Sequence, residues 1–221
     1  MASNSKPAAN LQFRHARVED AAEVAEIEHM SFADSAPDDI YHEPELALLF
    51  SRFPDGCFVA LDESTIVAMG IGLFTDFDLA NPVHRVSDIG GDTGAEHDPD
   101  GDWYYGTSIA VRPEYRGMGI GRRLYELRKG CVQKYNRRGI IAGGVLPDYV
   151  HHKDEMDAGT YIEKVRNGEL FDSTLTFQLA NGFEAPCALP GYMDNDSGSA
   201  ALIVWHNPDY ISSNASTGDP T

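Results

Sequence analysis

Along the chain, stretches whose apolar residues recur at helical spacing alternate with shorter runs that are apolar throughout or alternate along an extended backbone. Helical spacing predicts helices over residues 18–32, 45–52, 122–136 and 173–180. Apolar and alternating runs predict strands over 11–16, 57–61, 65–74, 102–111, 140–146, 183–189 and 200–206. This order of elements predicts an α/β fold of the α+β kind, with a mixed sheet and helices on both faces.

Polar stretches separate some of these elements. Residues 76–102 form a predicted polar loop rich in Asp and Gly, long enough to be functional or mobile. Residues 148–168 are polar and partly helical in pattern, which predicts an insertion. We expect a disordered lead over 1–10, one domain over 11–211 and a disordered tail over 212–221.

The segment from Asp102 to Gly121 predicts a strand that passes through a glycine-rich turn into a helix. On an extended chain, one face collects aromatic and β-branched side chains, namely Trp103, Tyr105, Thr107, Ile109 and Val111. Three glycines within residues 117–121 leave backbone amides with no side chain above them. At a helix N-terminus such amides are free donors at the positive end of the dipole, which predicts a seat for phosphate or pyrophosphate.

The charge distribution agrees with a seat for an anion. The chain carries 35 acidic and 17 basic residues, a formal net charge of -18 that repels nucleic acid and anionic membranes and attracts cations. Basic residues nevertheless gather in the turn and the helix after it, which predicts a local cationic island. We therefore expect a small polyanionic ligand there, and neither nucleic acid nor membrane as a partner.

Other motifs give weaker predictions. The glycine spacing and the missing Gly-Lys-Ser/Thr argue against a dinucleotide fold and an NTP-binding loop. Asp98-Pro99-Asp100 resembles the start of a calcium loop, but the twelfth position is Ile109, so a solvated acidic loop is expected and no metal. The three cysteines are expected to be small core residues in a reducing compartment. The N-terminal sequence lacks the pattern of a signal peptide and no run spans a bilayer, which predicts a cytoplasmic location.

The turn and its flanks resemble the GNAT superfamily of acyl-CoA-dependent N-acyltransferases. Its phosphate turn, Arg/Gln-x-x-Gly-x-Gly/Ala after an apolar-x-Val step, matches Ile109-Ala110-Val111 followed by Arg116-x-x-Gly119-x-Gly121. The opening LQFRHARVEDAAEVAEIE and the late LTFQLANGFE are similar to that family's first strand and helix and its last helix and turn. The C-terminal stretch further resembles GNAT domains found next to carbon-nitrogen hydrolases, although no hydrolase domain fits in the chain.

The resemblance implies a mostly antiparallel sheet of six to seven strands and acetyl-CoA, or another acyl-CoA, as co-substrate. The cofactor pyrophosphate would bind the amides of Arg116, Gly117, Met118, Gly119, Ile120, Gly121 and Arg122. The pantetheine arm would pair with Ile109, Ala110 and Val111. Many members of the family dimerise, so a homodimer is left open.

The chain departs from the family at both positions of proton chemistry. Tyr105 stands where a carboxylate base is common, and Gln178 stands where a tyrosine often acts as the general acid. Tyrosine has a pKa of roughly 10 and is a poor base at neutral pH. We therefore take Asp102, Tyr104, Tyr105 and the acids of the 76–102 loop as candidates for relaying the amine proton or seating a cation. Tyr104 and Tyr105 lie on opposite faces of the strand, so at most one of them is expected in the core.

The hypothesis that follows is an N-acetyltransferase that acts by direct attack of a primary amine on the thioester. The acidic residues of the long loop and of the whole chain favour a small cation as the acceptor, such as an aminoglycoside or a polyamine. An aminoglycoside acceptor would imply a role in antibiotic resistance. Protein N-termini and lysines stay open as acceptors. The competing hypothesis is a catalytically silent acyl-CoA-binding module, because the usual base and acid are missing.

Overall fold

A computed structural model of the chain describes residues 10–93 and 95–212, so all but Asn10 and Ser212 of the expected lead and tail lie outside the described residues. Its centre is a seven-stranded sheet in the order β1-β2-β3-β4-β5-β7-β6. The strands are β1 (Leu11–His15), β2 (Phe58–Asp62), β3 (Thr65–Thr75), β4 (Trp103–Val111), β5 (Gly139–Val145), β6 (Glu184–Pro190) and β7 (Ser199–His206). Only the β4–β5 pair is parallel. The mixed, mostly antiparallel sheet expected from the sequence is confirmed.

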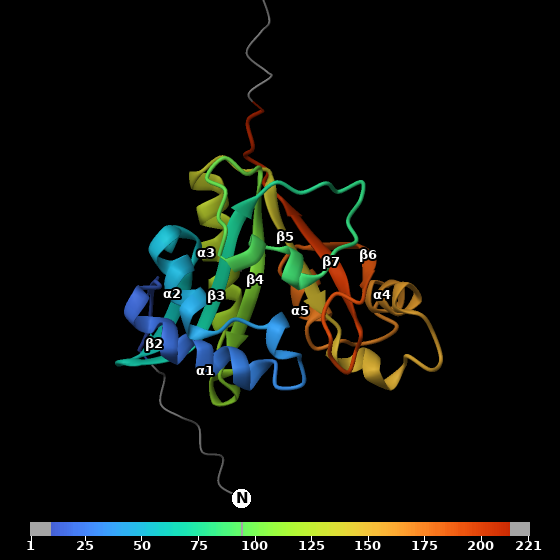
Figure 1. The fold of residues 1–221 in the computed structure, drawn as a ribbon. Coiled ribbons are helices and arrows are strands. Elements are labelled where there is room, and N and C mark those ends of the chain that lie inside the picture. The colour runs from blue at the N-terminus through green and yellow to red at the C-terminus, as the bar shows by residue number, and fades with distance from the viewer. Residues whose placement is uncertain (1–9, 94, 213–221) are drawn as a thin grey trace, which may run out of the picture.

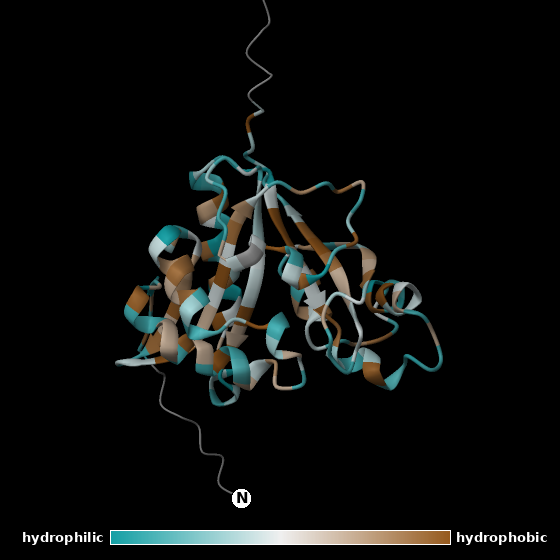
Figure 2. Ribbon diagram, in the orientation of Figure 1, coloured by the Kyte–Doolittle hydropathy of each residue, from teal (hydrophilic) through white to brown (hydrophobic). Residues whose placement is uncertain are grey.

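Helices cover both faces of this sheet (Figure 1). One face carries α1 (Ala21–Ser31) and α2 (Glu43–Arg52), and the other carries α3 (Ile120–Lys134) and α5 (Leu175–Ala180). The stretch 148–168, expected to be a polar insertion, contains α4 (Ala158–Arg166), which packs on β6. Its buried residues fall at helical spacing, at Ala158, Tyr161, Ile162 and Val165. Figure 2 shows hydrophobic residues on the strands and polar ones on the outer helix faces, and no helix among the described residues is long and apolar enough to cross a membrane.

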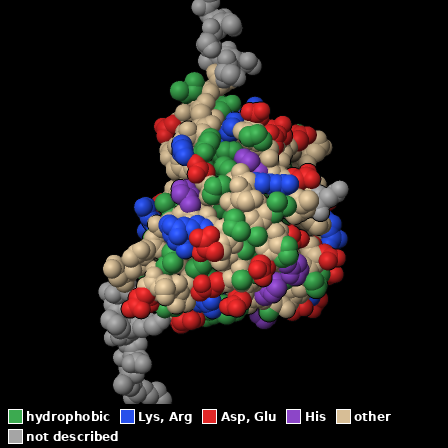
Figure 3. All heavy atoms as spheres, turned by 60° about the vertical axis from the view of Figure 1, so that its left-hand side comes forward, with side chains coloured by type: hydrophobic (Ala, Val, Ile, Leu, Met, Phe, Trp, Pro, Cys, Tyr) green, Lys and Arg blue, Asp and Glu red, His purple; other side chains and the backbone are tan. Residues whose placement is uncertain are grey.

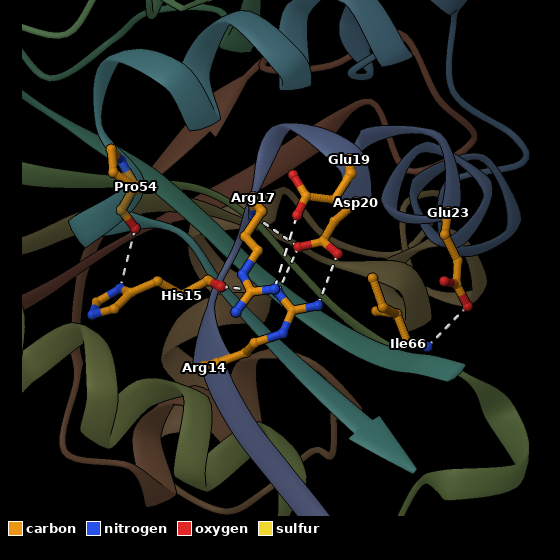
Figure 4. A network of polar contacts seen from close by, with 8 residues as sticks. All are labelled: Arg14, His15, Arg17, Glu19, Asp20, Glu23, Pro54 and Ile66. Carbon is orange, nitrogen blue, oxygen red and sulfur yellow. Dashed lines mark hydrogen bonds and ion pairs between the residues drawn. The ribbon is translucent and has the colours of Figure 1, made fainter. Parts of the chain in front are cut away.

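A polar network fixes the start of α1 against two strands (Figure 4). The carboxylate of Asp20 accepts two hydrogen bonds from the Arg14 guanidinium, at 2.6 and 2.8 Å, and one from the backbone N–H of Arg17 at 2.7 Å. One turn later, Glu23 accepts a hydrogen bond from the N–H of Ile66 at 2.8 Å. α1 is therefore tied to β1 and β3, which sets the position of every side chain along it.

A β-bulge in β4 changes which side chains share a face. Leu73 of β3 pairs with Tyr105, but Ile71 pairs with Ser108, so β4 gains one residue relative to β3. After the bulge, Ser108 contacts α1, while Ile109 lies opposite Gly70, which faces α3. The prediction of one shared face from Trp103 to Val111 is therefore wrong for Ile109 and Val111, which lie on the α3 side.

The two halves of the sheet separate at its parallel pair. β4 and β5 pair over three positions, from Trp103–Gly139 to Tyr105–Ile141. Beyond these positions β4 follows β3 and β5 follows β7, so the two strands diverge (Figure 1). We call this gap the fork. On the β5 side of the fork, the ring of Tyr192 packs over Gly143 and the side chain of Gln178 packs over Gly144.

Candidate functional site

The glycine-rich turn lies where β4 ends and α3 begins. Gly117 and Gly119 have φ values of 78° and 80°, in the left-handed region that favours glycine, and Gly119 is the N-cap of α3. A Cβ atom added to either residue would meet no heavy atom within 4 Å. The space above these amides is therefore open, and the turn has the geometry of an anion seat at a helix N-terminus.

Fewer basic side chains stand around this turn than the sequence predicts. Arg116 donates from Nε to the carbonyl of Val111 at 3.2 Å, and Arg122 is exposed beside the turn. The rest of the predicted cationic island is largely engaged elsewhere, as in the ion pairs Arg123–Glu126, Lys134–Asp55 and Arg138–Asp102. The anion seat therefore depends on amides and on a few arginines, because most basic residues of this segment hold the fold together.

The edge of β4 that faces the fork is not paired with β5 over the predicted pantetheine-pairing residues, although the carbonyl of Val111 accepts a hydrogen bond from Arg116. Ile109, Ala110 and Val111 pair with Gly70, Met69 and Ala68 of β3 on one side. On the other side β5 has already diverged, since its last partner on β4 is Tyr105. An extended ligand can therefore add to this edge as a strand would.

A cavity of about 510 Å³ opens on the opposite side, on the face of α1 and α2. Its wall consists of residues 37–42, Glu45, 86–89, Gly91 and Thr107 of β4. Four wall residues are acidic and none is Lys or Arg: Asp38, Asp39, Glu45 and Asp88. Figure 3, in which the left-hand side of Figure 1 is turned forward, shows histidine and acidic side chains side by side on part of the surface. We call this cavity the acidic pocket; its volume and polar lining suit a small cationic ligand.

Asp39, in the wall of the acidic pocket, contacts two segments far away in the sequence. Its carboxylate accepts a hydrogen bond from the N–H of Asp194 at 2.6 Å and lies 3.7 Å from the Arg85 guanidinium. The N–H of Val86 in turn donates to the carbonyl of Tyr192 at 2.9 Å. The first part of the 76–102 loop is thereby held against the sheet as a wall of the pocket.

A buried carboxyl group stands behind this pocket, on α1. Glu28 is 4% exposed, and its Oε2 accepts a hydrogen bond from Ser108 Oγ at 2.5 Å. Burial raises the pKa of Glu28 to about 7, while hydrogen bonds from Ser108 and the N–H of Tyr41 oppose that rise. The sequence analysis missed this residue. The sequence does contain a signal for this residue. Glu28 falls at helical spacing after the buried residues Ala21, Val24 and Ala25, so an acid occupies a position where an apolar residue is expected.

Tyr105, a predicted site residue, lies at the fork in a chain of polar contacts. Its Oη lies 3.0 Å from Tyr192 Oη and 2.5 Å from Nε2 of His84. The N–H of Gly143 on β5 also hydrogen-bonds to both tyrosine hydroxyls. Burial raises the pKa of Tyr105 well above its ordinary value, so its hydroxyl keeps its proton at neutral pH. Neither His84 nor Tyr192 was expected in the site.

The other predicted candidates lie elsewhere. Tyr104 is fully buried on the α3 face, where its hydroxyl donates to the carbonyl of Gly56 at 2.6 Å, so both tyrosines belong to the core and the expectation of at most one is wrong. Asp102 lies before β4 begins and pairs with Arg138 at 3.0 Å, roughly 10 Å along the strand from Tyr105 and about 30 Å from the end of the strand at Val111. The structure does not bring Asp102 to the fork. Gln178 is buried against Gly144 of β5, and its Oε1 has no partner among the described residues.

A family model described as the acetyltransferase (GNAT) family matches residues 21–140. The chain belongs to the GNAT family. A Bacillus subtilis (strain 168) protein described as an uncharacterized N-acetyltransferase, YkwB, is 30% identical over 179 residues, which are 77% of this chain and 77% of that protein. The probable hydrolase YhcX of the same organism is 39% identical over 164 residues, 72% of this chain but 32% of YhcX. This GNAT chain thus spans about a third of the length of YhcX.

Solved structures agree with the family at the level of the fold. The GphF GNAT-like decarboxylase in complex with isobutyryl-CoA superposes with a TM-score of 0.72 at 21% identity, covering 89% of this chain and 99% of that one. The GNAT resemblance expected from the sequence is therefore confirmed.

Proposed function

We propose that this GNAT protein transfers an acetyl or other short acyl group from acyl-CoA to the primary amine of a small cationic acceptor, such as a polyamine or an aminoglycoside. One observation carries the proposal: a single strand, β4, contributes Thr107 to the wall of the acidic pocket and leads at its end into the open turn of α3. We propose that donor and acceptor approach this strand from opposite faces of the sheet.

On the donor side, the amides of residues 116–122 are the proposed contacts of the pyrophosphate, with charge added by Arg116 and Arg122. The free edge of Ile109–Val111 would bind the pantetheine arm by backbone hydrogen bonds and lead the thioester into the fork. These residues fit the co-substrate because the space above Gly117 and Gly119 is open and β5 does not pair with this part of β4.

On the acceptor side, the acidic pocket would hold a cation and aim one amine at the fork. Thr107 lines the pocket from the bulge of β4, directly beside Ser108. Attack of the neutral amine on the thioester carbon forms the C–N bond, and the C–S bond breaks to release coenzyme A. Holding both reactants in this geometry supplies much of the rate, about 7–11 kcal/mol in favourable cases. Tyr105, at the fork, is proposed to take part in removing the amine proton.

The test is a thiol-release assay with acetyl-CoA and spermidine on a variant that carries Asp38→Asn and Asp88→Asn. Removing two charges from the pocket wall should raise KM for spermidine about tenfold, at roughly 0.7 kcal/mol for each charge, and leave KM for acetyl-CoA within a factor of about two. The matched control carries Asp98→Asn and Asp100→Asn, which remove two acids from the same loop but outside the pocket wall. A larger effect of the control pair would overturn the assignment of the pocket.

The same assay separates the enzyme from a silent binding module. A module that only binds acyl-CoA would show a thermal shift with coenzyme A and no thiol release with any amine. Protein N-termini or lysines as acceptors predict release with peptides and none with spermidine.

A further inference from the structure

His84, Tyr105 and Tyr192 form a line of hydrogen bonds that leads from a half-exposed imidazole to the fork. His84 comes from the 76–102 loop, Tyr105 from β4 and Tyr192 from the β6–β7 connection. The two tyrosine side chains are almost completely buried, at 0% and 2% exposure. Two buried tyrosine hydroxyls are thus hydrogen-bonded to an imidazole that solvent can reach. Packing of the core alone does not require such a polar network.

The geometry fixes the tautomer of His84. Its Nδ1 lies 2.6 Å from the carbonyl oxygen of Pro82, and a carbonyl can only accept a hydrogen bond. Nδ1 of the neutral ring must therefore carry the proton, which leaves Nε2 as an acceptor for the hydroxyl of Tyr105. Tyr105 then accepts from Tyr192, and the line points from the fork towards His84.

The far end of the line lies at the point where β4 and β5 separate. The ring of Tyr192 covers Gly143 so closely that a Cβ atom there would lie 2.2 Å from its Cζ. Gly143 follows Ile141, the last β5 residue paired with β4, by two positions. The backbone carbonyl of Tyr192 accepts a hydrogen bond from the N–H of Val86, a residue of the acidic pocket wall, so Tyr192 connects the fork to that wall.

From this arrangement we infer that His84 is the terminal base of the reaction, and that Tyr192 and Tyr105 relay the amine proton to it. The inference rests on the proposed function. As the C–N bond forms, the N–H bond breaks and its electron pair stays on nitrogen, while the proton binds Tyr192 Oη. The hydroxyl proton of Tyr192 passes to Tyr105 Oη, and that of Tyr105 passes to Nε2 of His84. His84 releases its proton to solvent, and the thiolate of coenzyme A takes one up.

Other titratable groups near this line are few, and Glu28 is the main competitor. His84 is in ring contact with Phe77, Tyr105 and Tyr192, and the nearest charged groups along the chain are Arg85 and its partner Asp39. Glu28 reaches β4 through Ser108, on the same face but after the bulge. An experiment on the relay must therefore compare His84 with Glu28.

The experiment measures steady-state thiol release for wild type, His84→Gln, Tyr105→Phe and Glu28→Gln, with His151→Gln as control because His151 is exposed and outside the site. Loss of the base should lower kcat on the order of 10²-fold in His84→Gln and Tyr105→Phe, with KM for acetyl-CoA unchanged. Imidazole added to His84→Ala should restore activity, which a merely structural role would not allow.

The outcomes are distinct. Full activity of His84→Gln, or a loss in Glu28→Gln that exceeds the loss in His84→Gln, overturns the relay while the transferase stands. Wild type that binds coenzyme A but releases no thiol overturns the transferase itself. Nitrogen-15 NMR of labelled histidine gives a readout without turnover: the neutral His84 ring should carry its proton on Nδ1, and a proton on Nε2 would contradict the relay.

Discussion

Glu28 shows how one residue can be costly for the fold and still be held in place. The carboxyl group lies on α1 among buried apolar positions, and Ser108 is its side-chain partner. The anchoring of α1 to β1 and β3 through Asp20 and Glu23 holds the helix there (Figure 4). A buried acid whose pKa lies near neutral pH destabilises the native state when it ionises.

Stability should therefore fall as pH rises through the pKa of Glu28. The native state binds the Glu28 proton more tightly than the unfolded state, in which the pKa of the carboxyl group is 4.5. The contribution of this proton to the free energy of unfolding is therefore full below pH 4.5 and is lost as the pH rises through about 7. The difference corresponds to about 3 kcal/mol. Urea unfolding of Glu28→Gln at pH 5 and pH 8 should show the variant gaining about that amount over wild type at the higher pH. Glu126→Gln, at an exposed site, is the control, and an equal difference at both pH values would contradict the prediction.

Two neighbouring arginines allow a sharp test of the anion seat. Arg122 is exposed beside the open amides, whereas Arg123 is already paired with Glu126 at 2.8 Å. Arg122→Ala should weaken coenzyme A binding about tenfold in isothermal titration, because a charge-assisted contact with phosphate is lost. Arg123→Ala should change the dissociation constant less than twofold. Similar losses in both variants would mean that only the general positive charge matters.

At the scale of elements, the sequence predicted the strands and most helices to within a few residues. Hydrophobic periodicity depends only on neighbouring residues, and the glycine-rich turn is recognisable from its own residues. Both could therefore be predicted from the sequence. The stretch 148–168 has a partly helical pattern and contains α4, whose buried residues fall at helical spacing and pack on β6, so it is a helix of the domain. The bulge in β4 has no local signal, because it is defined by the register with β3.

The acceptor side of the site depends on tertiary contacts, so most of it could not be predicted from the sequence. Asp39, His84 and Tyr192 come from three separate connections and meet only because the chain folds the 76–102 loop over the sheet. The prediction of a cation seat took all the acids of that loop as candidates, and of these only Asp88 lines the acidic pocket. Composition showed that an acidic surface exists, but only the fold shows where it lies.

The glycine at position 143 of β5 should be required for the geometry of the fork. A Cβ atom there would lie 2.2 Å from the ring of Tyr192, so Gly143→Ala must displace that ring from the hydroxyl of Tyr105. We expect kcat to fall at least tenfold while coenzyme A binding stays within twofold. Gly130→Ala is the matched control, since a Cβ atom there meets nothing within 4 Å and should stabilise α3 by about 0.5–1 kcal/mol. Unchanged kcat in Gly143→Ala would show that Tyr192 need not stand at the fork.

At the scale of the whole molecule, the charges are arranged with opposite sign on the two proposed approaches. The formal net charge is -18, and the walls of the acidic pocket contain no Lys or Arg. Positive groups next to the turn are confined to Arg116 and Arg122, backed by the helix amides. The field of the protein therefore favours a cation at the pocket, and local contacts hold an anion at the turn.

Salt should consequently weaken the capture of a polyamine far more than that of a monoamine. The attraction between a -18 protein and a trivalent or tetravalent cation acts over distances beyond contact, and the Debye length falls from about 30 Å at 0.01 M to about 3 Å at 1 M salt. Raising NaCl from roughly 0.02 to 0.5 M should reduce kcat/KM for spermine on the order of tenfold, with a much smaller change for a singly charged amine of the same length. Steady-state thiol release at saturating acetyl-CoA measures both. If the two amines respond alike, the overall charge of this protein has no part in selecting its acceptor, and selection lies within the pocket walls alone.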